Sequence, residues 1–374
     1  PGIFEPHETI GLTPGHLSVC VTELEKIKLL DSNLEVIDAA FEYLLPDVAK
    51  GKKGQYFTPR HVITMAVKML NPQDGEYIID PACGSGGFLI QTMRYIWANS
   101  LKTVSKEARV EYARKYLYGI DFDEKSVKIA RALMLIAGDG KSHILNLNSL
   151  NPKEWQGDEP DKLRARAELQ ERLRSFDDYD QNRQNRDGFK YFDFDILLSN
   201  PPFAGEIKES LLFREYELAK NDKGKLRNKM ERHILFIERS LDLIKPGGRM
   251  AIVLPQGVFN NTNIEYVRNY LLDKARILAV VGLDVNTFKP HTGTKTSVLF
   301  LRKWGEKENP PKDYPIFMAV SKKSGKDSSG EYVYRKDKDG NIMFDDKGKK
   351  ILEHDLDEIA EEFLKFVKEK KIDA

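Results

Sequence analysis

The chain has 374 residues, of which 41% are hydrophobic and 31% charged, with a formal net charge of +1 at pH 7 and two cysteines, Cys20 and Cys83. This length can hold one large α/β domain with appendages or two domains, and two cysteines exclude a disulfide framework or a multi-cysteine zinc site, so no metal is expected. The near-neutral charge lacks the footprint of a stand-alone nucleic-acid binder, and the absence of a membrane span or a secretory leader predicts a cytoplasmic protein.

Two helices are predicted before the first strand. Ser32 can cap a helix that continues to Leu45 and ends before Pro46, so we expect residues 1–53 to be an N-terminal helical segment. A second amphipathic helix is predicted from about Arg60 to Leu70.

Short apolar runs then alternate with helical stretches. This alternation predicts an α/β domain over residues 54–320, with a mostly parallel seven-stranded sheet and helices on both faces. The predicted strands are Tyr77–Asp80, Leu117–Asp121, His143–Leu147, Phe194–Ser199, Met250–Leu254, Ile277–Leu283 and Ser297–Leu301.

Three further segments complete the chain. Residues 151–193 are highly charged and predict a surface insertion, either partly helical or mobile. A helix is predicted from Arg232 to Ile244, before Lys245-Pro246-Gly247-Gly248. Residues 321–374 predict a charged hairpin around Asp339-Gly340 and an amphipathic helix, Asp355–Lys371, which packs on its own domain or forms an interface.

The segment Asp80-Pro81-Ala82-Cys83-Gly84-Ser85-Gly86-Gly87 follows a strand and opens a helix. A dinucleotide fingerprint requires glycine at position 89, where this chain has leucine, and a P-loop requires Gly-Lys-Ser/Thr, which is absent. An acid before a Gly-x-Gly turn suits a ligand with a cationic amine and a carboxylate, such as S-adenosylmethionine. A strand-to-helix turn without a ligand is the alternative.

The ends of the next two strands add candidate cofactor contacts. Asp121 can bind ribose hydroxyl groups, and Phe122 can lie against an adenine ring. Asn148 could contact the adenine edge. The alternatives are a helix cap formed by Asp121 or Asp123, and an ordinary turn at Asn148.

The turn Asn200-Pro201-Pro202-Phe203 follows a predicted buried strand. An exocyclic amine on a base is a poor nucleophile because its lone pair is delocalised into the ring. The Asn200 side-chain oxygen and the Pro201 carbonyl, stiffened by Pro202, offer two acceptors for its N–H groups, and Phe203 offers a face for an extruded base.

Basic residues follow this turn. Residues 220–232 carry Lys223, Lys225, Arg227 and Lys229 among their cations, and Lys295 lies before the seventh strand. These five side chains are candidate phosphate contacts. A solvated loop and helix face is the alternative.

Five ordered motifs carry a resemblance to adenine-specific DNA methyltransferases, above all to the modification subunit of type I restriction-modification systems. The motifs are Gly54–Pro59, Asp80–Leu89, Asn200–Phe203, Val253–Pro255 and Thr292–Phe300. The resemblance implies a Rossmann-like methyltransferase fold, S-adenosylmethionine as the cofactor and double-stranded DNA with a flipped adenine as the substrate. The partners it implies are a separate specificity subunit and a restriction subunit.

By the same resemblance, Gln55, Tyr56, Phe57, Thr58, Ser85, Gly86 and Gly87 hold the methionine part of the cofactor, with Asp80 close by. Asp121 binds the ribose, and Asn200 and Pro201 receive the amino hydrogens of an adenine stacked on Phe203. Two departures are an asparagine, Asn148, where family members often have an acid, and a short N-terminal helical region.

Two other functions stay open from the sequence. A protein glutamine N-methyltransferase also needs an amide held by an Asn-Pro-Pro turn, although Phe203 and the element Thr292–Phe300 favour DNA. A non-catalytic scaffold subunit would bind the cofactor without turnover.

Overall fold

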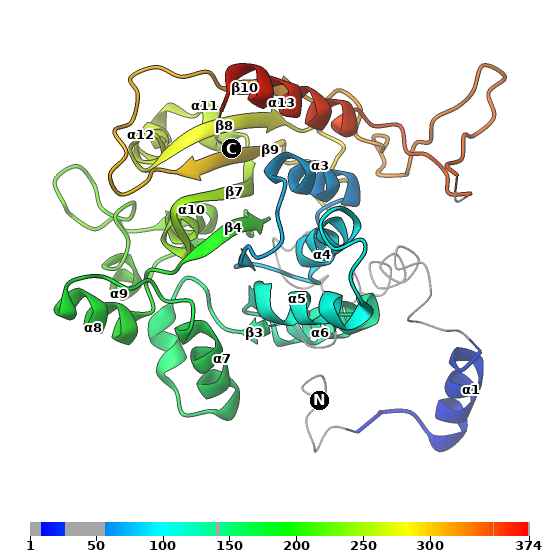
Figure 1. Ribbon diagram of the computed structural model, residues 1–374, viewed down its shortest axis with the longest axis horizontal. Helices are drawn as coiled ribbons and strands as arrows, with labels where there is room; N and C mark the ends of the chain where they lie inside the picture. Colours follow the sequence, from blue (N-terminus) through cyan, green and yellow to red (C-terminus); the bar gives the residue numbers. More distant parts are fainter. Residues whose placement is uncertain (1–8, 27–56, 140–142, 347, 373–374) are drawn as a thin grey trace.

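The computed structural model describes residues 9–26, 57–139, 143–346 and 348–372. Its centre is an eight-stranded sheet with the order β10-β8-β9-β7-β4-β1-β2-β3 (Figure 1). The strands are β1 (Ile78–Asp80), β2 (Leu117–Asp121), β3 (His143–Asn146), β4 (Phe194–Ser199), β7 (Ile244–Pro255), β8 (Ala275–Gly282), β9 (Thr296–Lys303) and β10 (Phe317–Val320).

The predicted mostly parallel sheet is confirmed, with one addition. All neighbouring strands run parallel except β9, which is antiparallel to both β7 and β8. The eighth strand, β10, is not among the predicted strands. In addition, β7 begins at Ile244, and its pairing with β4 shifts register between Phe194 and Ile196, so the predicted stop at residues 245–248 is an irregular start of the strand.

Helices cover both faces of the sheet (Figure 1). Alternate strand residues point into two separate cores: Ile78 and Leu198 pack into one, Ile79 and Leu197 into the other. The first face carries α3 (Arg60–Leu70), α4 (Gly87–Asn99), α6 (Glu124–Ala137) and α13 (Leu356–Lys370), with α5 (Lys106–Tyr116) beside β2. The second carries η2 (Pro152–Gln156), α7 (Pro160–Gln170), α9 (Ser210–Phe213), α10 (Arg232–Leu243), α11 (Gly257–Asn260), η3 (Thr262–Ile264) and α12 (Glu265–Lys274).

The helices predicted before and after the sheet have different outcomes. The predicted helix Ser32–Leu45 lies outside the described residues. Helix α1 (Pro14–Leu24) lies within the segment 1–53 that was predicted to be helical, although no helix was placed at these residues, and it has no buried residue. The predicted helix from Arg60 to Leu70 is confirmed as α3, and the C-terminal helix is confirmed as α13.

Two forms were predicted for the charged stretch 151–193, partly helical or mobile, and the structure shows the partly helical one. It contains η2, α7 and α8 (Tyr179–Gly188). Trp155, Leu169 and Phe192 anchor it, since none of these side chains is accessible to solvent.

Residues 321–354, here called the C-terminal arm, extend from the body as a narrow ribbon (Figure 1). The predicted hairpin around Gly340 is present, with Lys336 paired to Ile342, but it is one of three such turns. The backbones of Gly325, Val333 and Glu353 form a closed ring of three hydrogen bonds of 2.9–3.0 Å. Arg335, Met343 and Ile351 form a second ring, at 2.8–3.0 Å, so three chain segments share each layer of the arm.

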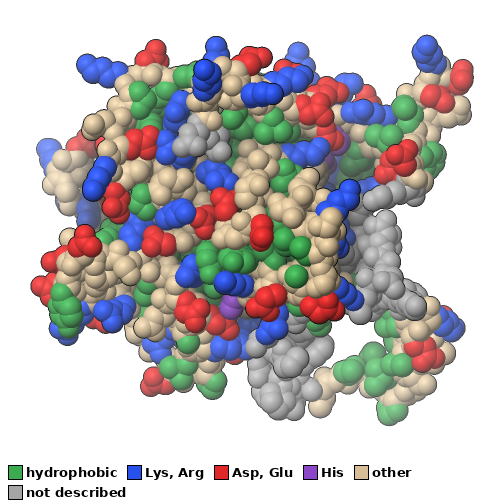
Figure 2. Space-filling view, viewed as in Figure 1, with side chains coloured by type: hydrophobic (Ala, Val, Ile, Leu, Met, Phe, Trp, Pro, Cys, Tyr) green, Lys and Arg blue, Asp and Glu red, His purple; other side chains and the backbone are tan. Residues whose placement is uncertain are grey.

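The surface agrees with the small net charge. Lys and Arg side chains are interspersed with Asp and Glu over the face shown in Figure 2. Of the helices in the part of the chain that the structure describes, none combines the length and the apolar character needed to cross a bilayer.

Candidate active site

A cleft of about 710 Å³ runs along the carboxyl edge of β1, β2, β3 and β4. Parallel strands bring their carboxyl ends to one edge of a sheet, which is why motifs far apart in the sequence meet there. The predicted site residues that line it are Phe57, Thr58, Asp80, Gly84, Ser85, Gly87, Asp121, Phe122, Asn148, Asn200, Pro201, Pro202 and Phe203. Gln55 and Tyr56 lie outside the described residues.

Asp80 is at the floor of the cleft and only 1% exposed. Its carboxylate accepts hydrogen bonds from the Ser199 hydroxyl at 2.7 Å and from the Ala82 N–H at 3.0 Å. Burial raises the pKa of Asp80 to about 7. Ser199, the last residue of β4, was not among the predicted site residues, although it joins the cofactor turn to the Asn200 turn.

The glycines of the turn after β1 have different roles. Gly84 has a φ of +52°, and a side chain there would extend into open space, so the glycine leaves a cradle in the cleft. Gly86 has a φ of +84°, and its Cα faces Ala130 and Met134 of α6. Gly86 was predicted to hold the cofactor, but it does not line the cleft. It permits the turn that starts α4.

Asp121 joins two turns of the cleft. Its carboxylate accepts the N–H of Gly84 at 2.9 Å and the N–H of Asp123 at 2.9 Å. Burial raises the pKa of Asp121. The helix cap considered as an alternative is made by Asp123, whose side chain accepts the N–H of Ser126 at 3.0 Å. Phe122 is 71% exposed and offers its ring to the cleft.

The loop after β3 is held by its own side chains. Asn148 donates to Glu154 at 3.0 Å and accepts the Leu150 N–H at 3.2 Å, so both ends of its amide stabilise the turn. Glu154, which sequence analysis did not identify, places a carboxylate in the cleft lining beside Asn148. The Ser149 hydroxyl donates to the Pro81 carbonyl at 2.6 Å and thereby ties this loop to the turn after β1.

Residues Asn200–Phe203 leave the end of β4 and share the cleft with the glycine turn. The Phe203 ring packs edge-on against the buried Phe288 ring, with a centroid distance of 6.3 Å. Asn200 and Pro201, whose side-chain amide oxygen and backbone carbonyl are hydrogen-bond acceptors, line the same cleft as the Phe203 ring. This arrangement can hold and orient an amino group on a planar ring.

The five predicted DNA-contacting cations lie outside the cleft lining. Lys229 is paired with Glu206 at 2.5 Å, and the Arg227 guanidinium lies 4.0 Å from the Tyr266 ring centre. Lys223, Lys225 and Lys295 are exposed elsewhere on the surface. Three cations do line the cleft: Arg232, which belongs to the predicted basic stretch 220–232, and Arg60 and Lys125, which were not predicted.

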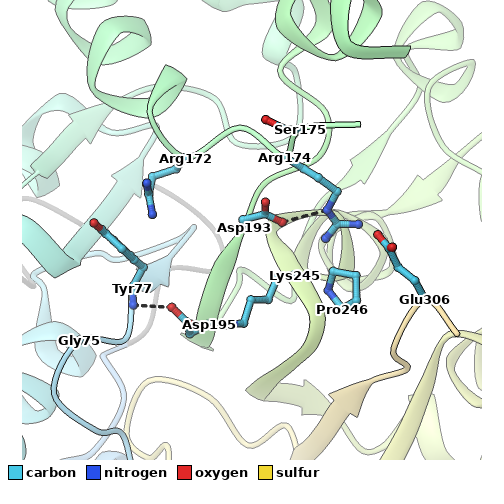
Figure 3. A pocket seen from close by; sticks show the side chains of 10 residues that line it. All are labelled: Gly75, Tyr77, Arg172, Arg174, Ser175, Asp193, Asp195, Lys245, Pro246 and Glu306. Carbon is cyan, nitrogen blue, oxygen red and sulfur yellow. Dashed lines mark hydrogen bonds and ion pairs between the residues drawn. The ribbon is translucent and has the colours of Figure 1, made fainter. Parts of the chain in front are cut away.

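A second hollow, of about 490 Å³, lies at the amino edge of the sheet (Figure 3). Arg174 is paired with Asp193 at 2.9 Å, Lys245 is paired with Asp195, and the Arg172 guanidinium lies 3.7 Å from the Tyr77 ring centre. The charged side chains of the lining are therefore three cations and three acids: Arg172, Arg174 and Lys245, and Asp193, Asp195 and Glu306. This hollow is a network that fastens strand starts together, and no predicted site residue reaches it.

Comparison with known proteins identifies one family. The family model for N-6 DNA Methylase matches residues 32–373. The chain is 28% identical over 319 residues to the type I restriction enzyme EcoKI methylase subunit of Escherichia coli (strain K12), covering 80% of this chain and 52% of that protein. It is 25% identical over 265 residues to the EcoEI methylase subunit of Escherichia coli, covering 70% and 45%. The chain therefore spans about half the length of the curated relatives it matches.

Solved structures support the fold. The type I restriction-modification system methyltransferase subunit from Streptococcus thermophilus superposes with a TM-score of 0.56 at 21% identity, over 95% of this chain and 62% of that one. This similarity confirms the predicted Rossmann-like methyltransferase fold.

Proposed function

The chain belongs to the N-6 DNA methylase family, and we propose that it transfers a methyl group from S-adenosylmethionine to the N6 atom of adenine in DNA. We further propose that it serves as the modification subunit of a type I restriction-modification system. One observation carries this proposal: the Asp80–Gly87 turn and the Asn200–Phe203 turn open into the same cleft. Neither turn alone would specify both a cofactor and a nucleophile.

The residues of the cleft fit S-adenosylmethionine. Its volume of about 710 Å³ lies in the usual range for ligand pockets. The Gly84 cradle admits a close backbone approach, the Asp80 carboxylate suits a cationic amine, and Asp121 suits ribose hydroxyls. When bound, S-adenosylmethionine supplies an electrophilic methyl group on a sulfonium.

The Asn200 turn supplies the other half of the chemistry. The amide oxygen of Asn200 and the carbonyl of Pro201 accept the two N–H groups of the target amine. These hydrogen bonds strengthen as the nitrogen becomes tetrahedral, so they stabilise the transition state more than the ground state. Phe203, supported by Phe288, holds the flipped ring by stacking.

We propose that DNA sequence recognition comes from a separate specificity subunit, and that a restriction subunit is a further partner. The relatives are named as methylase subunits of type I restriction enzymes, which supports this division of labour. The five basic side chains predicted to contact DNA lie outside the cleft lining. We propose that they contact DNA phosphates beyond the cleft in the complex with these subunits.

The test combines the chain, its specificity partner, unmethylated DNA and cofactor labelled in the methyl group. We expect label in adenine of the DNA, and Asn200→Ala should lower the rate by a factor on the order of 10³ while leaving cofactor affinity within about twofold. Transfer to protein would instead support the glutamine methyltransferase alternative. Cofactor binding without transfer, with the partner present, would support the scaffold alternative.

A further inference from the structure

Arg232 is the first residue of α10 and lines the cleft together with Asn200 and Phe203. Its N–H donates to the carbonyl of Gly205 at 3.2 Å, two residues beyond Phe203. A side chain added to Gly205 would come within 3.4 Å of the Arg232 guanidinium carbon. The arginine side chain therefore lies against the backbone of the loop that follows Asn200, on the side of the cleft that the proposed function assigns to the target base.

The charge of the Arg232 side chain is not balanced by a partner in the part of the chain that the structure describes. Among the described residues, its side chain makes no ion pair and no hydrogen bond, whereas Lys229 on the same loop is paired with Glu206. Arg232 is also exposed to solvent, so it is not required as an internal structural charge. A positive side chain at the mouth of an active cleft, without an internal partner, suits an anionic ligand.

The other two cations in the cleft lining are placed differently. Arg60 already interacts within the protein. Lys125 belongs to the first turn of α6, next to Asp121 and Phe122, on the side assigned to the cofactor ribose and adenine. Arg232 is the lining cation beside the Asn200 turn, and this position separates it from the cofactor contacts.

We propose that Arg232 binds a backbone phosphate next to the flipped adenosine and so holds the extruded nucleotide in the cleft. The inference rests on the proposed function and names a contact for it. Rotating a nucleotide out of the duplex carries its flanking phosphates toward the protein. A planar guanidinium can bind two phosphate oxygens at once, which an ammonium group cannot do.

The test uses the complex with the specificity partner and a duplex carrying a site that the wild-type complex methylates. Arg232→Gln should raise KM for this duplex about tenfold near 0.15 M salt. It should also reduce the slope of log binding constant against log salt by about 1, as expected for one lost phosphate contact. Cofactor affinity should stay unchanged. With 2-aminopurine at the target position, the fluorescence rise that reports base extrusion should shrink.

Two further variants keep the outcome decisive. Arg232→Lys keeps the charge but not the fork, so it should restore the salt slope and leave KM raised. Lys312→Gln removes an exposed lysine that is neither in the cleft lining nor among the predicted DNA contacts, and it should change the salt slope and the base-extrusion signal little. The inference is overturned if Arg232→Gln retains the wild-type salt slope and fluorescence, or if Lys312→Gln reduces both equally. Failure of the wild-type complex to methylate DNA would overturn the proposed function instead.

Discussion

The Asp80 carboxyl group is buried. To hold the cationic amine of the proposed cofactor, it must become negatively charged. Burial raises its pKa to about 7, against the opposing effect of hydrogen bonds from Ser199 and Ala82. A bound ammonium group favours the carboxylate, so binding releases a proton wherever the free protein still holds one. The pH dependence of folding has the opposite direction to that of cofactor binding, because the folded state holds this proton more tightly than the unfolded chain does. The contribution to stability is therefore lost as pH rises through about 7.

This environment predicts a pH-dependent cofactor affinity. Below about pH 7 the dissociation constant should rise up to about tenfold for each unit of pH lost, and above about pH 8 it should level off. Asp80→Asn should weaken binding and abolish the pH dependence. Calorimetric titration in buffers of different ionisation enthalpy measures the proton release directly. A wild-type affinity that is flat between pH 6 and 8 would contradict the role given to Asp80.

Arg239 fixes the loop after β3, whose residues Asn148 and Ser149 line the cleft. It is 2% exposed, and it donates to the carbonyl of Ser149 at 2.9 Å, of Lys190 at 2.7 Å and of Phe189 at 3.0 Å. Arg239→Met should cost at least about 3 kcal/mol of unfolding free energy, because three carbonyls lose their donor. It should also weaken cofactor binding, because Ser149 in turn anchors Pro81. Denaturant unfolding and cofactor titration measure the two effects.

Arg249 offers a matched control for this prediction. It is also largely buried, and it donates to the Leu70 carbonyl and pairs with Glu76 at 2.9 Å, away from the cleft lining. Arg249→Met should lower stability by a similar amount and leave the cofactor affinity of the folded protein unchanged. If both variants lose affinity in proportion to stability, Arg239 has no positioning role.

These residues show what the sequence could predict and what it could not. Asp80 and Asp121 end predicted strands and Asn200 follows one, and parallel strands bring such residues to one edge, so their meeting was predictable. Ser199 contacts Asp80 from 119 positions away, and Arg239 contacts Ser149 from 90 positions away. Such contacts depend on packing across the sheet and leave no local pattern. Charge density likewise pointed to the whole stretch 220–232 and did not single out Arg232, its member in the cleft lining.

At the scale of elements, the C-terminal arm touches the active-site side of the body through its first turn. The Lys326 side chain donates to the Lys289 carbonyl at 2.8 Å, and the Lys289 side chain donates to the Ser328 carbonyl at 2.7 Å. Lys289 follows Phe288, which supports the Phe203 ring. The arm therefore supports the loop that backs the proposed base-stacking residue.

Gly330 is the close contact in this docking. Its φ is +99°, and an added Cβ would lie 2.5 Å from the Pro290 nitrogen, so Gly330→Ala must displace the turn from the loop. We expect faster amide hydrogen exchange at residues 287–292 and a higher KM for DNA, with cofactor affinity unchanged. Gly340→Ala is the control, since Gly340 has a φ of +87° with no atom within 4 Å. Equal exchange at residues 287–292 in both variants would contradict the proposed support.

The strands show a similar limit of prediction. A strand buried on both faces has the same apolar pattern in either direction, so the run Ser297–Leu301 predicted β9 but not its antiparallel orientation. The pattern of β10 covers only four residues, with Phe317 and Ala319 inward and Met318 exposed. So short an alternation does not stand out from a loop. The two hydrogen-bonded rings of the C-terminal arm likewise join residues as far apart in the chain as Gly325 and Glu353, which no local pattern predicts.

At the scale of the whole molecule, α13 connects the C-terminal part of the chain to α3, the helix that precedes the first strand. Phe363 packs against Phe300 of β9 and Phe317 of β10, with centroid distances of 6.1 and 5.6 Å. Helix α13 also packs on α3, where Lys68 pairs with Asp357 at 2.5 Å. Because α3 follows directly on Phe57 and Thr58 of the cleft, the last helix supports the cofactor side of the site. Of the two predicted roles of this helix, packing on its own domain is the one observed.

This arrangement predicts that α13 stabilises the catalytic fold and is not a dispensable tail. Phe363 is 1% exposed and the adjacent Leu364 is 42% exposed, so the pair separates a core role from a surface role on one helix. Phe363→Ala should lower the free energy of unfolding by about 3–5 kcal/mol through the cavity it leaves. Leu364→Ala should change it by less than about 1 kcal/mol. Denaturant unfolding followed by circular dichroism measures both. If α13 instead served mainly to bind a partner, the larger loss would appear in complex formation by the Leu364 variant, with both isolated chains equally stable.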